Sequence, residues 1–234
     1  MTSFDAIVIG TGQAGPPLAR DMAEAGMSVA IIERNLFGGT CVNTGCIPTK
    51  AMIASARAAY MARRAADFGV GISSGVSVDM KKVIERKNGI TGRHNEEVPE
   101  WMKKVKNLRV YKGHARFLSP DTVRIGDEVL KAEKIFINVG GRAFVPDLPG
   151  LETVDYLTNS DMVNLEEVPE HLVIVGGSYI GLEFGQMFRR FGARVSIVEK
   201  SDRIIQREDP EITEALQEIL AGEGIEFHTG AACI

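Results

Sequence analysis

Two closely spaced cysteines offer the most reactive chemistry in this sequence. Cys41 and Cys46 lie in the segment GGTCVNTGCIPTK, at residues 38–50, and four residues separate them. Zinc sites usually have a shorter gap and need four ligands, and no second Cys/His pair lies at a suitable spacing. Two interpretations remain: unrelated buried thiols, or a redox-active pair. In a cytosolic protein a disulfide is more often catalytic than structural.

The spacing of these cysteines places a condition on the backbone. Positions i and i+5 of a regular helix are not neighbours, so a bridge between them requires a local distortion. Gly45 lies between the two cysteines and can supply it. Pro48 lies where the chain turns into an apolar helix predicted over residues 51–66.

One sequence pattern occurs twice, and the elements that it predicts must hold the two cysteines in place. Residues 5–34 and 171–200 align when the second copy is shifted by 166 positions. Each copy has an apolar run, a glycine turn, a helical stretch, a second apolar run and a terminal acid. The first runs, 6–9 and 173–175, are unbroken, which is typical of parallel strands covered on both faces. The repeat predicts an α/β fold with two Rossmann-like dinucleotide-binding domains.

The glycine turn of the first copy has the spacing of a dinucleotide site. Gly10 makes the tight turn, Gly12 lets the backbone approach a pyrophosphate, and Gly15 lets helix and strand pack closely. The pyrophosphate then lies on the unpaired N–H groups at the start of the helix. Glu33 ends the second strand, where a carboxylate accepts hydrogen bonds from ribose hydroxyls. The order of these features favours a ligand over an empty glycine-rich turn.

The second copy departs from the first at one position. Gly176 and Gly181 match Gly10 and Gly15, but Ser178 stands where the middle glycine would be. Glu199 ends the second strand of this copy. A carboxylate there accepts from a ribose 2′-hydroxyl and repels a 2′-phosphate, which predicts a modest preference for NADH over NADPH.

The composition is that of an ordinary globular protein. The chain has 234 residues, 44% hydrophobic and 25% charged, with a formal net charge of −4. These values exclude disordered and collagen-like chains and make a nucleic-acid partner improbable. No apolar run reaches the ~18 residues needed to span a bilayer. The N-terminus has no basic segment typical of a signal peptide, so a cytoplasmic location without membrane contact is expected.

The segment GGTCVNTGCIPTK resembles the redox centre of the class I pyridine nucleotide-disulfide oxidoreductases, the family of dihydrolipoamide dehydrogenase, glutathione reductase and mercuric reductase. The resemblance extends along nearly the whole chain. It includes the two glycine turns and three further segments: GHARF at 113–117, INVG at 137–140 and PG at 149–150.

The resemblance implies that FAD binds the first glycine turn and that its ribose contacts Glu33. Thr40, beside Gly39, would lie near the ribityl and phosphate groups, and Ala115 would approach the adenine through its backbone. Gly140 would complete this set of flavin contacts. NAD(P)H would bind the second turn.

The same resemblance assigns roles to four catalytic residues. Cys46 would lie against the flavin and form the charge-transfer thiolate, while Cys41 would face the substrate as the interchange thiol. Lys50 would approach flavin N5 and pair with Glu183 from the second copy. Taken alone, Lys50 and Glu183 look like ordinary helix charges. Cys233, a lone thiol near the end of the sequence, is expected to be buried or incidental.

These expectations give a domain plan. Residues 1–150 would form the FAD-binding domain with the redox pair, and 151–234 the amino-terminal part of an NAD(P)-binding domain. The resemblance predicts an amino-terminal half, inactive alone, of an enzyme that dimerises through its carboxyl-terminal domain. Its substrate would be a small disulfide or dithiol, as in dihydrolipoamide dehydrogenase or glutathione reductase, or a metal ion, as in mercuric reductase. A flavin redox sensor without turnover and an inert nucleotide-binding module remain open.

Along the chain the sequence predicts the following elements: helices at 80–106 and 211–221, a loop with short strands at 67–79, strands at 108–110, 115–118, 122–125, 135–139 and 225–227, and a linker at 140–170.

Overall fold

A computed structural model describes residues 1–232. The chain forms two compact units, the first made of Met1–Pro48 with Asn88–Arg142 and the second of Thr49–Lys87 with Ala143–Ile234. Cys233 lies outside the described residues. The predicted domains, 1–150 and 151–234, rest on expected nucleotide binding and stay a prediction, whereas the compact units differ from them because residues 49–87 and 143–150 group with the second unit.

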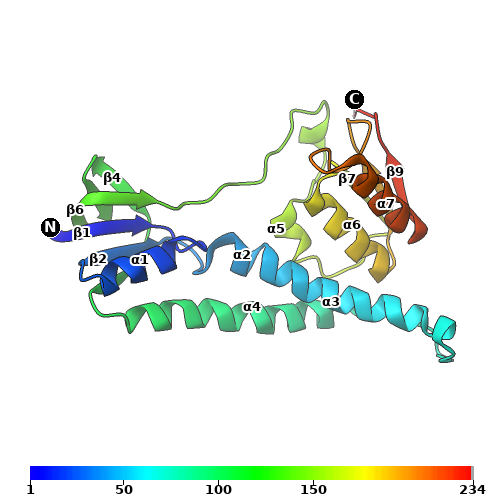
Figure 1. The fold of residues 1–234 in the computed structure, drawn as a ribbon, viewed down its shortest axis with the longest axis horizontal. Helices are drawn as coiled ribbons and strands as arrows, with labels where there is room; N and C mark the ends of the chain where they lie inside the picture. The colour runs from blue at the N-terminus through cyan, green and yellow to red at the C-terminus, as the bar shows by residue number, and fades with distance from the viewer. Residues whose placement is uncertain (233–234) are drawn as a thin grey trace. The chain divides into compact units, whose positions relative to one another are not determined.

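The first unit is built on a six-stranded sheet in the order β3-β2-β1-β6-β5-β4 (Figure 1). Neighbours from β3 to β6 run parallel, and β6-β5-β4 form an antiparallel meander. The strands are β1 (Thr2–Ile9), β2 (Val29–Glu33), β3 (Leu108–Lys112), β4 (Ala115–Ser119), β5 (Thr122–Ile125) and β6 (Glu128–Ile137).

Two apolar clusters cover the two faces of the parallel strands. On one face, helix α1 (Gly15–Glu24) packs Ala19 and Ala23 against Val8 and Ile31. On the other face, Ile7 and Ile32 pack with residues of the meander. Because both faces are buried, β2 is apolar from Val29 to Ile32 without alternation.

Four helical segments follow β2. They are α2 (Gly39–Asn43), α3 (Cys46–Arg63), the 3-10 turn η1 (Ala65–Phe68) and α4 (Met80–Lys103). Helix α3 begins at Cys46 rather than at the predicted residue 51, since Pro48 is tolerated in the first turn, where N–H groups need no partner. Helix α4 continues through Pro99 to Lys103. The short strands predicted within 67–79 are absent from that segment.

The second unit holds a parallel sheet in the order β7-β8-β9. Its elements are the 3-10 turn η2 (Leu151–Thr153), α5 (Asn159–Met162), β7 (His171–Val175), α6 (Tyr179–Phe191), β8 (Arg194–Val198), α7 (Pro210–Gly222) and β9 (Ile225–His228). Phe188 and Met187 of α6 lie in a core with Val195 and Ile197 of β8.

The predicted α/β fold class is confirmed, and in both units a glycine turn joins a parallel strand to a helix. The later elements also match closely: the helix predicted at 211–221 is α7 and the strand at 225–227 lies in β9. Strand β6 is longer at its start than the predicted 135–139 and ends at Ile137. The start of β6 pairs with β5, and β6 also pairs with β1 as far as Ile137. The strand therefore joins the parallel strands to the antiparallel meander.

Candidate functional site

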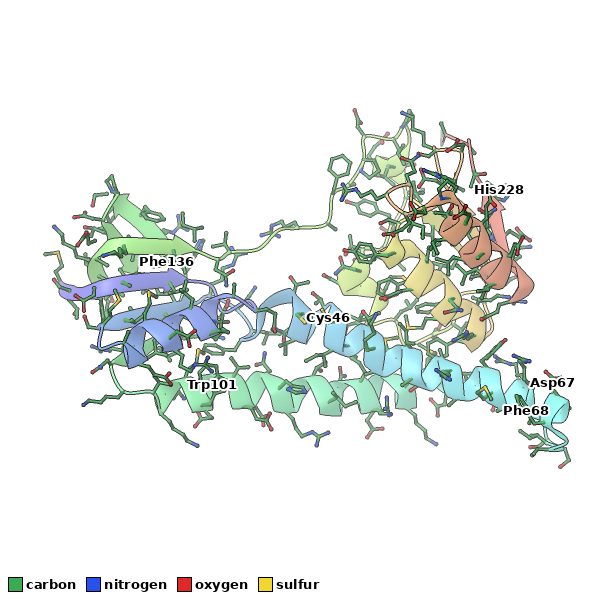
Figure 2. All side chains as sticks on the ribbon, in the orientation of Figure 1. Cys46, Asp67, Phe68, Trp101, Phe136 and His228 are labelled. Carbon is green, nitrogen blue, oxygen red and sulfur yellow. The ribbon has the colours of Figure 1, made fainter. Side chains whose placement is uncertain are left out.

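The two cysteines lie on either side of a break between helices. Cys41 is in α2, Thr44 and Gly45 interrupt the helical backbone, and Cys46 opens α3 (Figure 2). A β-carbon at Gly45 would come within 3.0 Å of the Thr40 carbonyl oxygen, so this turn is tight. The break supplies the distortion that the i, i+5 spacing requires.

Both cysteines are free thiols, and they interact with each other. Cys41 is half-buried and Cys46 is exposed. Burial raises the pKa of the Cys41 thiol, and the hydrogen bond to Cys46 raises that pKa further. A hydrogen bond that favours the protonated form means that the Cys41 S–H donates and the Cys46 sulfur accepts. A hydrogen bond from the Cys46 backbone acts in the opposite direction and lowers the Cys41 pKa, but burial and the side-chain hydrogen bond outweigh it.

Two asparagines hold the cysteine loop in place. The Asn43 amide donates to the carbonyl oxygens of Phe37 and Gly39, both at 2.9 Å. Asn95 of α4 donates to the same Phe37 carbonyl and to the Asn43 side-chain oxygen, also at 2.9 Å. The sequence interpretation missed both residues, because a single Asn in a helix carries no signal of its distant partner.

The first glycine turn is closely packed at two of its three glycines. A β-carbon at Gly10 would lie 2.1 Å from the Asn138 carbonyl oxygen, and one at Gly15 would lie 2.2 Å from the Gly10 carbonyl oxygen. At Gly12 it would meet only the Asn138 side chain, at 3.5 Å, which is an ordinary contact. Packing within the protein therefore requires glycine at the first and third positions but not at the second.

Glu33 organises this turn with its buried carboxylate. Its Oε2 accepts from the Thr11 backbone N–H at 3.0 Å and from the Thr11 hydroxyl at 2.6 Å. Its Oε1 accepts from the Asn35 N–H at 2.8 Å. The Thr11 hydroxyl in turn accepts from the Gly38 N–H at 3.2 Å. The predicted ribose ligand is thus also the group that joins the glycine turn to the loop after β2.

Asn138 is a further residue that the sequence interpretation missed at this turn. Its amide donates to the carbonyl oxygens of Gly10, at 3.3 Å, and Gly12, at 3.2 Å. Its backbone N–H donates to Ile9 at 2.8 Å. Because β6 pairs with β1, the end of one strand is brought beside the turn after the other. A polar residue inside an otherwise apolar predicted strand, 135–139, was the available signal.

The second glycine turn repeats the geometry of the first. Gly10 and Gly176 have the same φ of 105°. The Glu199 Oε2 accepts from the Gly177 N–H at 2.7 Å and its Oε1 from the Ser201 N–H at 2.9 Å, which are the counterparts of the bonds from Thr11 and Asn35 to Glu33. The repeat found in the sequence therefore extends to individual hydrogen bonds.

Glu199 is held in its ionised form. Burial acts to raise its pKa, but hydrogen bonds from the backbone N–H groups of Ser201 and Gly177 outweigh burial and hold the pKa below its ordinary value. Ser178, which replaces the middle glycine, caps the start of α6 with an extended backbone and no side-chain capping bond.

Lys50 and Glu183 form an ion pair within the second unit, through the Lys50 ammonium and the Glu183 Oε1. Lys50 lies on α3, one turn after Cys46, and Glu183 lies on α6. The Lys50 side chain is largely exposed, and an exposed pair of this kind contributes about 0–1 kcal/mol to stability. Stability alone does not account for the pair.

The structure gives the positions of three further predicted residues: Thr40, Ala115 and Gly140. A β-carbon at Gly39 would lie 2.7 Å from the Gly12 Cα, so the backbone just before Thr40 packs against the glycine turn. Ala115 is half-buried at the start of β4. Gly140 has a φ of 66° and no atom within 4 Å of an added β-carbon, so no packing contact ties it to the turn.

The first turn fits a dinucleotide phosphate. No side chain caps α1, whose first helical positions include two prolines without an N–H group. The Gly15 N–H donates to the Gly12 carbonyl oxygen at 2.9 Å, so the unpaired N–H groups expected from the sequence are not found at the first positions of α1, and the helix dipole is what favours an anion there. Gly12 leaves open the space that a side chain would fill. Within residues 1–232 no cluster of acids, histidines and cysteines could hold a metal ion, and no helix is long and apolar enough to cross a membrane.

Comparison with known proteins gives consistent matches along the chain. A profile described as pyridine nucleotide-disulphide oxidoreductase matches residues 4–233. The chain is 34% identical over 229 residues to a mercuric reductase of Bacillus cereus, covering 97% of this chain and 36% of that protein. It is 36% identical over 245 residues to a dihydrolipoyl dehydrogenase of Bacillus subtilis (strain 168), covering 98% of this chain and 51% of that protein.

A solved structure has the same fold. It is the HOCl-induced flavoprotein disulfide reductase RclA from Escherichia coli, with a TM-score of 0.84 and 34% identity, covering 97% of this chain and 49% of that chain. The chain thus spans about half the length of RclA and of the dihydrolipoyl dehydrogenase, and less of the mercuric reductase.

Proposed function

This chain belongs to the pyridine nucleotide-disulphide oxidoreductase family, which is flavin-dependent, and we propose that it passes electrons between NAD(P)H and a small disulfide or dithiol substrate through the Cys41–Cys46 pair. The observation that carries this proposal is the hydrogen-bonded pair of free thiols beside a glycine turn that fits a dinucleotide. Dihydrolipoyl dehydrogenase and RclA relatives support the disulfide chemistry.

The proposed exchange balances without a further reactant. NAD(P)H and one proton supply two electrons and two protons, which reduce the Cys41–Cys46 disulfide to two thiols. Cys41 loses its proton, and the resulting thiolate attacks a substrate disulfide, forms a mixed disulfide and releases one substrate thiolate, which takes up that proton. Cys46 attacks the Cys41 sulfur, releases the second substrate thiol and restores the disulfide.

The residues of this chain have separate tasks in that exchange. Gly10, Gly12, Gly15 and Glu33 would hold FAD, which supplies hydride acceptance and donation when bound. Cys46 opens α3, where the helix dipole would stabilise a thiolate against the flavin, and Lys50, fixed by Glu183, would place a cation one helical turn further along α3. Gly176, Gly181 and Glu199 would bind the nicotinamide nucleotide, and an ionised Glu199 favours NADH.

A second substrate class is a mercuric ion. The mercuric reductase relatives favour it, and soft thiolate ligands suit soft metal ions. NADH oxidation by the full-length protein, assayed separately with lipoamide, glutathione disulfide and Hg(II), distinguishes these substrates, and lack of activity with all three favours a redox sensor.

The absorbance of the flavin-loaded protein after two-electron reduction tests the proposed roles. A long-wavelength band from a thiolate against the flavin is expected. Cys46→Ser should remove the band, while Cys41→Ser should keep it, and both should abolish disulfide reduction. Interchanged spectra would reverse the two cysteine roles, and absence of the band from the unmutated protein would contradict the enzyme proposal.

A further inference from the structure

A hollow in the first unit gathers positive charge, and its lining reaches Lys112 and Gly113 at the end of β3, beside Glu33. Its volume is about 740 Å³. It lies between the edge strand β3 and the end of the β4–β5 hairpin. Three arginines line it, one from each strand: Arg109, Arg116 and Arg124. Glu128 is the sole acid among its lining residues, in a protein whose formal net charge is −4.

The strand register places two of these arginines against each other. Arg116 of β4 is directly opposite Arg124 of β5 in the antiparallel ladder. Like charges directly opposite each other destabilise a sheet. Within residues 1–232 neither guanidinium, nor that of Arg109, has a hydrogen bond or ion pair with a protein group, so Glu128, the one acid in the lining, is not paired with any of the three.

Tyr111 adds a buried donor without a partner. It lines the same hollow, is only 6% exposed, and its hydroxyl is the one buried side-chain polar atom without a hydrogen bond in the described part of the chain. The Arg109 guanidinium lies 5.1 Å from the centre of its ring. Burial raises the pKa of Tyr111, so its hydroxyl keeps the proton and is able to donate.

The backbone fixes the position of these groups. Gly113, between β3 and β4, lies so close to β5 that a β-carbon there would come 2.6 Å from the Ile125 side chain. Tyr111 and Ile125 both belong to the core between the parallel strands and the meander. The hollow is therefore set by packed elements, although its arginine side chains are exposed.

We propose that this arginine hollow, defined by Arg109, Tyr111, Arg116 and Arg124, binds a small phosphorylated anion. Guanidinium groups match phosphate oxygens with two parallel hydrogen bonds. The three arginines, together with Lys112 and against the single acid Glu128, leave the hollow net positive, and with the neutral Tyr111 donor they suit a ligand that carries more than one negative charge and only acceptors. A phosphate group meets both conditions, whereas a single carboxylate carries one charge.

Calorimetric titration of the 234-residue chain with pyrophosphate tests the proposal. FAD is kept in excess, because the glycine turn is a second place for phosphate. We expect saturable binding that Arg116→Ala/Arg124→Ala weakens about tenfold or more, since two charge-assisted hydrogen bonds are lost. Arg116→Lys/Arg124→Lys keeps the charge and should still weaken binding severalfold, because the paired hydrogen bonds are lost.

Matched variants separate a built site from general charge. Lys104→Ala/Lys106→Ala removes the same charge from exposed positions of the first unit and should leave the affinity within about twofold. Tyr111→Phe removes only the hydroxyl and should weaken binding about threefold to tenfold. Because it relieves repulsion, Arg116→Ala/Arg124→Ala should not lower the melting temperature of the ligand-free chain.

Three results would overturn the proposal: no saturable binding, equal weakening by the arginine and lysine double variants, or binding that disappears when FAD is in excess. A parallel titration with AMP identifies the source of the phosphate. Tighter binding of AMP than of inorganic phosphate indicates a nucleotide, and the reverse indicates a free phosphate anion.

Discussion

Cys41 and Cys46 differ in exposure, and they have different roles in the hydrogen bond between them, in which Cys41 is the donor. The half-buried Cys41 has a raised pKa, first because of burial and then because its S–H donates to Cys46. The thiolate is the reactive form of cysteine, so the two residues should differ in reactivity at neutral pH. The exposed Cys46 should react first with a small alkylating agent.

The pH dependence of Cys41 follows from the raised pKa. Alkylation of Cys41 by iodoacetamide, located by peptide mapping, should reach its half-maximal rate above the ordinary thiol pKa of about 8.5. A folded pKa above the unfolded value also means that stability is full below the unfolded pKa and falls as the pH rises through the folded pKa. Cys46→Ala should lower the midpoint of Cys41 alkylation only in part, because the variant removes the hydrogen bond to Cys46 while burial still raises the Cys41 pKa. A midpoint at or below 8.5 in the unmutated chain would contradict this account.

Within the first strand–turn–helix element, Gly12 and Gly15 belong to the same glycine turn but have separable roles. Gly15→Ala should destabilise the first unit by about 1–3 kcal/mol, because the new β-carbon would overlap the Gly10 carbonyl oxygen. Gly12→Ala should leave the free energy of unfolding in urea nearly unchanged, because the new methyl group meets no protein atom closely. It should weaken FAD binding, because that methyl group occupies the space expected for the pyrophosphate. Equal loss of stability in both variants would show that Gly12 is also a packing residue.

The second element carries the prediction on nucleotide choice. The Glu199 carboxylate, kept ionised by two N–H groups, should repel a 2′-phosphate. Glu199→Ala should narrow the preference for NADH, measured as the ratio of the two dissociation constants. Since Glu199 also joins Gly177 to Ser201, the melting temperature of the variant must be compared in parallel. An unmutated protein that prefers NADPH about tenfold, or about 1.4 kcal/mol, would refute the prediction.

These elements show which parts of the fold and site a sequence can predict. Glycine turns, unbroken strands and the 166-residue repeat depend on neighbours in the chain, and they were predicted with their glycines and terminal acids. Asn138, Asn43 and Asn95 were missed because their partners are brought together only by folding. The start of α3 was misplaced because Pro48 suggested a turn, although proline is equally suited to a first helical turn.

At the scale of the whole molecule, the Lys50–Glu183 pair links residues 133 positions apart. Glu183→Gln should change the free energy of unfolding by less than about 1 kcal/mol, as expected for an exposed pair. If Glu183 positions Lys50 for chemistry, the rate of NADH-dependent flavin reduction should nevertheless fall about tenfold to a hundredfold. Glu211→Gln, at an exposed position of α7, is the matched control. An unchanged reduction rate would leave the pair a surface ion pair only.

The central claim is that Cys41 and Cys46 act as one dithiol/disulfide couple, and equilibration in thiol–disulfide buffers tests it most directly. The thiol state of each cysteine is then read by peptide mass spectrometry. We expect one two-electron transition in which both thiols disappear together and a Cys41–Cys46 disulfide forms. The reason is that the two side chains form a hydrogen bond across the helix break at Gly45. Independent oxidation of the two cysteines, each as a mixed disulfide with the buffer thiol, would contradict the account.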